Sequence, residues 1–274
     1  MSIHPTAVVD SSAELGPDVV VGPYCVIGAN VEIGRGTRLE AHVVVEPYTT
    51  IGEDCQVRQG AVLGGPPQDH KYHGERTYVV IGNRNTIREF VTVHRATGEG
   101  EATRIGDDNM IMAYCHIGHN TLMGSGIIMA NMVGISGHCL VEDRVVFGGI
   151  VGVHQFVRIG KFAMIGGMSK VVMDVPPFMM ADGRPTEVAG LNVLGLRRAG
   201  IQPKIRAGLK HAYRLLYRSG FNLSQGIEAA YNEVDPSDER DYLLEFLSHI
   251  RGGYGGRGAD PRRTPPPEQR ESDA

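Results

Sequence analysis

The stretch "LGPDVVVGPYCVIGANVEIGRGTR", residues 15–38, carries a large apolar residue at every sixth position. The same series starts at Ile3 and ends at Val171, and only three acidic residues interrupt it: Asp69, Glu75 and Glu99. A period of six fits neither a helix, with 3.6 residues per turn, nor a simple strand, with a period of two. Hexapeptide repeats are typical of parallel β-helices, in which three hexads make one coil. We therefore predict an all-β, left-handed parallel β-helix of about ten coils.

The positions within each hexad differ in character. The first residue is large and apolar and the fifth is small or β-branched, so we expect both to point inward and the third and fourth to form the corner. All four cysteines occupy the fifth position: Cys25, Cys55, Cys115 and Cys139. We therefore interpret them as reduced core residues rather than as disulfides or thiolate metal ligands.

The repeat also divides the chain. Residues 1–176 form the predicted β-helix, with loops near 65–79 and 95–103, where the series breaks. Long loops in a tight solenoid are often functional. Residues 177–251 contain stretches with helical periodicity and predict a small helical C-terminal domain. Residues 252–274 are rich in glycine, proline and charge, so we expect a disordered tail.

Composition limits the classes of function. The net charge of −4 argues against a general binder of nucleic acid or of membrane surfaces. The N-terminus, "MSIHPTAVVD", has neither the basic region nor the apolar run of a signal peptide. No segment reaches the roughly 18 apolar residues of a membrane span. We expect a soluble, cytoplasmic protein without membrane insertion.

The hexad register predicts a cluster of polar residues along one edge. His119 is a third-position residue. Steps of three hexads toward the C-terminus lead from it to Gly137 and Gln155, with His138 and His154 beside them. The same steps toward the N-terminus lead to three further positions near the two loops: Glu101, Asn83 and Gly65. None of the histidines is at an inward position, which argues against a packing role.

Such an outward histidine cluster favours general acid–base chemistry, because the unperturbed pKa of histidine is about 6.5. A zinc site like that of the gamma-class carbonic anhydrases is the alternative. A purely structural or binding solenoid would need no such grouping.

Between Val188 and Ile227 there is no acidic residue but there are seven basic ones: Arg197, Arg198, Lys204, Arg206, Lys210, Arg214 and Arg218. This segment predicts an anionic partner, such as a diphosphate or an acidic carrier protein.

Several motifs resemble one known family in order and in spacing. They are "DHKYHGE" (69–75), "REFVTVHRAT" (88–97), "AYCHIGHN" (113–120), "ISGHCLVED" (135–143), "GVHQFVRIG" (152–160) and "LNVLGLRRAG" (191–200). Together they resemble the UDP-N-acetylglucosamine O-acyltransferases, the first enzymes of lipid A biosynthesis. The resemblance runs from the N-terminus to about residue 250, through both predicted domains.

The resemblance implies a homotrimer with active sites between neighbouring β-helices. Such an enzyme moves a 3-hydroxyacyl chain from acyl carrier protein to the glucosamine 3-hydroxyl of UDP-N-acetylglucosamine. It uses no cofactor, no metal and no covalent enzyme intermediate. His119 matches the general base that would deprotonate the hydroxyl.

The resemblance also assigns substrate contacts. The matching positions are Gln68, Asp69, Lys71, His116, His138, His154, Gln155, Asn192, Arg197 and Arg198. A backbone N–H at Gly137 or His138 matches the donor to the oxyanion. Gly167 falls near the residue that measures acyl-chain length, and a glycine there would leave the groove open for a long chain.

Two positions depart from the family pattern. Asn120 follows the predicted base where aspartate is usual, and Leu194 stands where an acidic nucleotide contact is common. These departures leave open an amide-forming relative that acts on a 3-amino sugar nucleotide. An N-acyltransferase acting later in the same pathway and an acetyl-CoA-dependent hexapeptide acetyltransferase are further alternatives.

Overall fold

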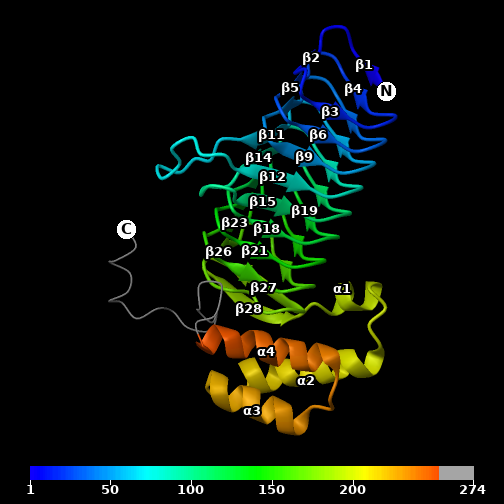
Figure 1. Ribbon diagram of the computed structural model, residues 1–274. Coiled ribbons are helices and arrows are strands. Elements are labelled where there is room, and N and C mark those ends of the chain that lie inside the picture. Colours follow the sequence, from blue (N-terminus) through cyan, green and yellow to red (C-terminus); the bar gives the residue numbers. More distant parts are fainter. Residues whose placement is uncertain (253–274) are drawn as a thin grey trace.

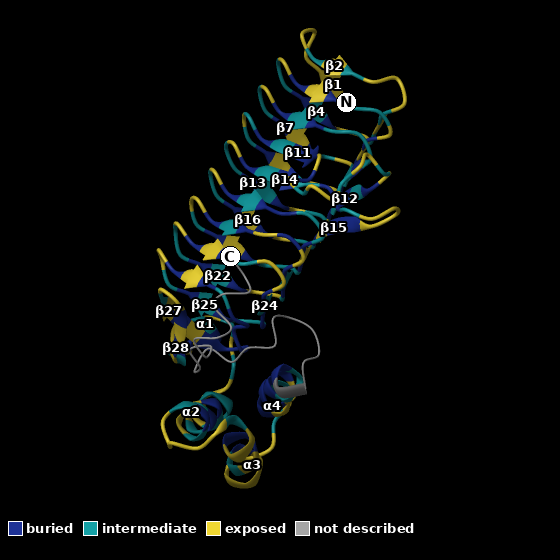
Figure 2. Cartoon of the chain, turned by 90° about the vertical axis from the view of Figure 1, so that its left-hand side faces the viewer, coloured by how far each residue is buried: buried dark blue, intermediate teal, exposed yellow. Residues whose placement is uncertain are grey.

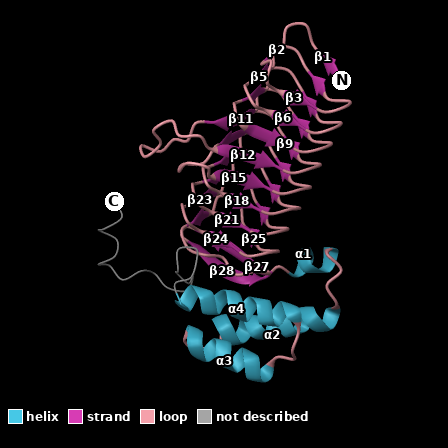
Figure 3. Cartoon of the chain, viewed as in Figure 1, coloured by secondary structure: helices cyan, strands magenta, loops and turns pink. Residues whose placement is uncertain are grey.

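The chain winds into a three-sided prism with helices stacked at one end (Figures 1 and 3). The computed structural model describes residues 1–252, so the predicted tail lies outside the described residues except for Gly252. The three sides are parallel sheets, as predicted for a left-handed parallel β-helix. None of the helices in the described part is long and apolar enough to cross a membrane.

Each side of the prism is one sheet, and successive strands of the chain go to sheets A, B and C in turn. Sheet A contains β1 (Ser2–Ile3), β4 (Val20–Val21), β7 (Arg38–Leu39), β10 (Gln56–Val57), β13 (Thr86–Ile87), β16 (Met110–Ile111), β19 (Ile128–Met129), β22 (Val146–Phe147) and β25 (Met164–Ile165). Sheet B contains β2 (Val8–Val9), β5 (Val26–Ile27), β8 (Val44–Val45), β11 (Val62–Gly65), β14 (Thr92–His94), β17 (His116–Ile117), β20 (Gly134–Ile135), β23 (Gly152–Val153) and β26 (Lys170–Val171). Sheet C contains β3 (Glu14–Leu15), β6 (Glu32–Ile33), β9 (Thr49–Ile51), β12 (Tyr78–Ile81), β15 (Ala102–Ile105), β18 (Leu122–Met123), β21 (Leu140–Val141) and β24 (Arg158–Ile159).

The hexad explains which side chains form the core. First and fifth positions are buried from the second coil onward, including all four cysteines, which are free. In Figure 2, buried positions lie along the walls of the prism and many exposed positions lie at its corners. The fourth position turns the corner in the left-handed region, with φ of 55° at Asn30 and 59° at His138. Asparagine and histidine tolerate this region better than most residues do.

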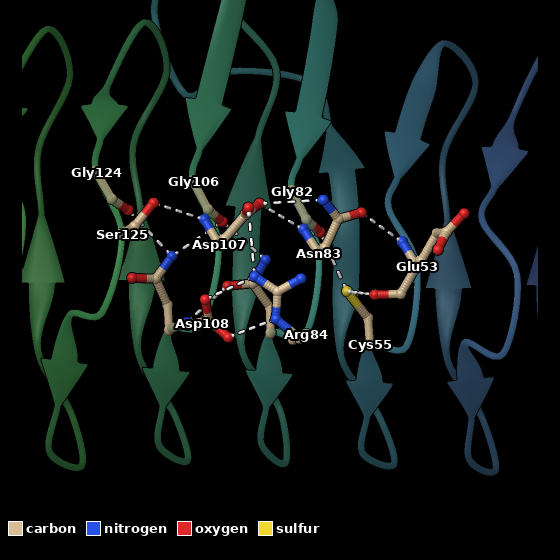
Figure 4. A network of polar contacts seen from close by, with 12 residues as sticks. Glu53, Cys55, Gly82, Asn83, Arg84, Gly106, Asp107, Asp108, Gly124 and Ser125 are labelled. Atoms are coloured by element: carbon tan, nitrogen blue, oxygen red, sulfur yellow. Dashed lines mark hydrogen bonds and ion pairs between the residues drawn. The ribbon is translucent and has the colours of Figure 1, made fainter.

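Polar side chains tie successive coils together at the corner between sheets C and A (Figure 4). Backbone N–H groups there donate to side chains of the next coil, at 2.7–2.9 Å, in the series Glu53 to Asn83, Asn83 to Asp107, Asp107 to Ser125 and Ser125 to Asp143. These bonds satisfy corner N–H groups that the sheets leave without a partner.

The two loops lengthen the interval between stacked residues. A regular coil of three hexads separates partners such as Ile117 and Ile135 in sheet B. Leu63 instead pairs with Val93, and Val93 pairs with Ile117, so both of these coils are longer than three hexads. The loops therefore use up residues that would otherwise form part of a further coil. Each coil contributes one strand to sheet B, which has nine strands, whereas about ten coils were predicted.

This longer interval corrects the residues predicted below His119. The register places Arg95, and not Glu101, one coil below His119. Asn83 is at a different corner, between sheets C and A, because it follows β12. Gly65 does lie on the predicted edge, where it pairs with His94. Both loops thus leave the prism directly after strands of sheet B.

The C-terminal part begins with a hairpin and continues with helices. Strands β27 (Met179–Gly183) and β28 (Thr186–Leu191) are antiparallel, and β27 extends sheet A beside β25. Helical structure was predicted from residue 177, but the first helix starts only after this hairpin. The helices are α1 (Val193–Arg198), α2 (Pro203–Tyr217), α3 (Leu223–Glu233) and α4 (Asp238–Gly252).

Helix α4 contacts the prism through Tyr242. The Tyr242 hydroxyl donates to Glu142 Oε2 at 2.5 Å, and Glu142 also accepts from the Arg158 guanidinium at 2.6 Å. The Lys161 ammonium lies 3.8 Å from the centre of the Tyr242 ring. Burial and the hydrogen bond to Glu142 raise the pKa of Tyr242 to about 12. The helices are therefore anchored to sheet C by a polar contact as well as by their apolar core.

Candidate active site

A cavity of about 510 Å³ opens on the outer face of sheet B. Its floor includes Gly134 and Gly152, where an added Cβ would meet nothing within 4 Å. His119 lies at the edge of the cavity, at the corner after β17, and Lys170 is a lining residue three coils further along the chain. The two glycines leave open an elongated space between the histidine and the lysine.

The position of the His119 ring depends on Gly137. A Cβ at position 137 would lie 2.4 Å from His119 Nε2 and 2.6 Å from Cε1, which no atom can do. The imidazole thus occupies the space of the side chain that glycine lacks. The other ring nitrogen, Nδ1, is 2.9 Å from Asn120 Oδ1. His119 is held on both sides, and its side chain is 14% exposed.

The first loop brings a carboxylate and an amide to the same place. Asp69 Oδ2 lies 3.9 Å from His119 Nε2, beyond hydrogen-bond distance. Asp69 Oδ1 accepts from the Lys71 N–H at 3.0 Å, which fixes the turn of the loop. Gln68 lines the cavity. The predicted grouping of the first loop with the histidine edge is therefore present in the geometry.

Three further histidines lie at or beside the cavity, and their pKa values are lowered: His94 and His116 line it, and His138 packs against His119. The His138 ring lies nearly perpendicular to the His119 ring, at 5.1 Å between ring centres, and stacks on the Phe156 ring at 4.8 Å. Burial, and then the charge of His119, lower the pKa of His138. Burial likewise lowers the pKa of His116, whose Nδ1 is 2.8 Å from the Thr92 hydroxyl. The pKa of His94 falls to about 4 through burial.

The two predicted oxyanion donors are not equivalent. The His138 N–H already donates to the His119 carbonyl at 2.9 Å. The Gly137 N–H has no hydrogen-bond partner among the described residues. Of the two, only Gly137 therefore has an N–H available for an incoming oxyanion.

Four predicted site residues lie away from this cavity. Asn192 caps α1, because its Oδ1 accepts from the Gly195 N–H and its Nδ2 donates to the Phe162 carbonyl. Arg197 and Arg198 end the same helix, and in Figure 1 α1 lies on the opposite side of the prism from the first loop. Gly167 is at the corner between sheets A and B, against Gly149, and does not line the cavity. Within a single chain, these four residues do not lie near His119.

Of the other predicted residues, Gln68, His116, Gly137, His154 and Gln155 line the cavity. Asp69 and His138 instead lie beside His119, and Lys71 belongs to the same loop as Asp69. His154 and Gln155 belong to the same corner as His119, two coils closer to the C-terminus. Sequence reasoning did not select His94, Lys170 or Phe156 as site residues. The register contained the signal for two of them, because His94 follows an inward residue of sheet B and Lys170 points outward two coils above Gly134. Within residues 1–252, no group of three or more His, Cys, Asp or Glu side chains is arranged to hold a metal ion.

A prism of hexapeptide repeats with a histidine beside a free backbone N–H at one corner is typical of the hexapeptide-repeat acyltransferases. Comparison with known proteins narrows this class. Residues 1–35 match the model of the bacterial transferase hexapeptide (six repeats), and residues 174–257 match domain 2 of UDP-N-acetylglucosamine O-acyltransferase.

Relatives match almost the whole chain. Acyl-[acyl-carrier-protein]–UDP-N-acetylglucosamine O-acyltransferases from Anaeromyxobacter dehalogenans and Thermodesulfovibrio yellowstonii are 45% and 49% identical, over 92% of this chain and 99% and 98% of theirs. The solved structure of LpxA from Acinetobacter baumannii is 41% identical with a TM-score of 0.88, and covers 95% of this chain and 100% of its own. The chain belongs to the UDP-N-acetylglucosamine O-acyltransferase family.

Proposed function

We propose that this protein transfers a 3-hydroxyacyl chain from acyl carrier protein to the glucosamine 3-hydroxyl of UDP-N-acetylglucosamine, the first step of lipid A biosynthesis. The observation that carries the proposal is the position of His119 Nε2, which is next to Gly137 and faces Asp69 at the edge of the cavity. A base, an oxyanion donor and a carboxylate thus converge where an acyl groove opens.

The chemistry follows from these positions. His119 Nε2 takes the proton of the sugar hydroxyl as its oxygen attacks the thioester carbonyl. The Gly137 N–H donates to the oxygen on which negative charge develops. Asp69 stabilises the imidazolium that forms, because opposite charges attract strongly where water is limited. When the tetrahedral intermediate collapses, the carrier thiolate leaves and receives the proton from His119.

The groove between Gly134 and Lys170 would hold the acyl chain. Its glycine floor offers no side chain that blocks an apolar chain laid along sheet B. Gly167 would affect chain length only from the neighbouring corner, where the missing side chain leaves space for a long chain, and we retain it as the proposed ruler on family grounds. Gln68, Lys71, His116, His138, His154 and Gln155 would contact the sugar nucleotide and the acyl carbonyl.

We further propose that the protein acts as a homotrimer. The corner between sheets A and B carries an apolar ridge, formed by Phe90, Tyr114, Met132, Ile150 and Met168. Each of these side chains is about half exposed, and exposed apolar surface of this extent marks protein interfaces. In a trimer, α1 of one subunit can reach the cavity of the next, so that Asn192, Arg197 and Arg198 would contact the nucleotide there.

The four free, buried cysteines fit the reducing cytoplasm, where we place the reaction.

An acyl-transfer assay tests the proposal. The full chain is incubated with UDP-N-acetylglucosamine and 3-hydroxyacyl carrier proteins of several chain lengths, and the products are measured by mass spectrometry. We expect one acyl chain to be added through an ester, which hydroxylamine cleaves. Absence of product with every chain length would contradict the proposal.

The same assay decides between an ester and an amide product. Asn120 and Leu194 are the observations that favour an amide-forming enzyme, since both replace acidic residues usual in the family. A parallel reaction with the 3-amino analogue of the sugar nucleotide measures this alternative. A kcat/KM higher for the amine than for the alcohol would assign the protein to amide formation.

A further inference from the structure

Asn120 has more contacts to the second loop than to the base that it follows. Its Oδ1 accepts from the Thr97 N–H at 2.9 Å and from the Thr97 hydroxyl at 3.0 Å. Its Nδ2 donates to the Thr97 carbonyl at 3.0 Å. The Asn120 N–H donates to the Thr103 hydroxyl at 2.8 Å. One residue of the loop, Thr97, thus engages both ends of the amide.

These contacts fix which end of the amide faces His119. The Thr97 N–H requires an acceptor and the Thr97 carbonyl requires a donor. The reversed amide would set N–H against N–H and oxygen against oxygen. The atom 2.9 Å from His119 Nδ1 is therefore the Asn120 oxygen. An amide oxygen only accepts, so Nδ1 of a neutral His119 carries the hydrogen and Nε2 keeps the lone pair.

We infer that Asn120 is a positioning residue that selects the reactive tautomer of His119, and that Thr97 of the second loop sets the orientation of Asn120. The inference rests on the proposed function, because it assigns a use to the Nε2 lone pair. It also gives a physical reason for an amide rather than a carboxylate at position 120 of this chain. An aspartate at this position would place a carboxylate oxygen about 3 Å from the Thr97 carbonyl, where two acceptors repel.

The asparagine also sets the charge next to the proposed base. An amide oxygen orients the ring but stabilises the imidazolium less than a carboxylate would, because it carries no net charge. The charged and titratable groups around His119 come from several elements: Asp69 and Lys71 of the first loop, Glu101 of the second, and His94, His116 and His138 of sheet B and its corner. Asn120 contributes a neutral contact among these groups.

The test compares two variants, Asn120→Asp and Asn120→Ala, by the dependence of kcat/KM on pH. In Asn120→Asp, we expect the acidic limb to move up by about one pH unit, since the added carboxylate stabilises the charged ring. In Asn120→Ala, the limb stays in place, kcat falls by about 10- to 100-fold, and KM for the sugar nucleotide is unchanged.

Asn30→Ala is the matched control, because Asn30 occupies the same hexad position at the same corner, with φ of 55° against 57° for Asn120. It carries the same backbone strain and should keep full activity. An Asn120→Ala enzyme with unchanged kcat would overturn the inference, and so would an Asn120→Asp enzyme with an unmoved acidic limb. If Asn120→Asp does not fold, the kcat of Asn120→Ala decides alone. A wild-type protein without transfer activity would instead refute the proposed function.

Discussion

Position 137 is where the identity of a single residue matters most for the site. The His119 ring fills the volume that a Cβ would take, and the Gly137 N–H is the free donor beside it. One glycine therefore serves both the proposed base and the proposed oxyanion site. The corner register brings these two residues together, since position 137 lies one regular coil after position 119.

Gly137→Ala should therefore reduce activity strongly while the fold is retained. The methyl group would push His119 Nε2 away by about 1 Å, and a displacement of this size costs about 100-fold in rate. Steady-state kinetics and circular dichroism measure the two effects. Gly190→Ala is the control, because a Cβ there meets nothing within 4 Å. A Gly137→Ala enzyme with wild-type kcat would show that the ring can move at no cost.

We predict from the lowered pKa of His94 that the free energy of unfolding falls in acid. Burial lowers the pKa of His94 to about 4, whereas unfolded histidine titrates near 6.5. As the pH falls from 6.5 to 4, the unfolded state binds a proton that the folded state does not, so the free energy of unfolding decreases. His94→Asn should flatten this dependence in melting curves recorded across that range. An unchanged slope would mean that His94 protonates equally in both states.

The sequence predicted the corner residues better than the loop residues. His119, Gly137 and Gln155 follow from a strict interval of three hexads, which strand pairing enforces coil by coil. The contact between Thr97 and Asn120 does not follow from any interval, because the second loop leaves the repeat before residue 97. Hydrogen bonds among loop residues depend on a path that periodicity does not encode.

At the scale of elements, helix α4 is joined to sheet C by the hydrogen bond from Tyr242 to Glu142. Tyr242→Phe removes only the hydroxyl and leaves the carboxylate with one donor fewer. We expect a loss of about 1 to 2 kcal/mol in the free energy of unfolding, measured by urea titration. Tyr231→Phe, on the exposed side of α3, should change nothing. Equal stability of both variants would show that apolar packing alone holds α4.

The hexads and the loops also differ in what the sequence could predict at this scale. Apolar residues at a period of six fixed the strands, since each inward residue is buried. The longer coils from Leu63 to Val93 and from Val93 to Ile117 were not predictable, and the error moved Asn83 to the wrong corner. The hairpin of β27 and β28 was not predicted, because the prediction after the hexads rested on helical periodicity alone, which begins at residue 191.

At the scale of the whole molecule, the apolar ridge is the feature that one chain leaves unexplained. Met132→Glu would place a charge in its middle, and burying an unpaired charge is strongly unfavourable. We expect this variant to elute as a monomer in size-exclusion chromatography with light scattering, and to lose activity. Leu122→Glu is the control, because Leu122 is 46% exposed on sheet C, outside the ridge. A trimeric Met132→Glu protein would place the interface elsewhere.

The measurement that tests the central claim most directly is the rate of acyl transfer by His119→Ala, with oligomeric state measured on the same sample. General base catalysis contributes about 10²- to 10⁴-fold, so we predict a loss of kcat of that size in an assembly of unchanged mass. His211→Ala, in α2, should match the wild type. A His119→Ala enzyme within about tenfold of the wild-type rate would contradict the assignment of His119 as the base.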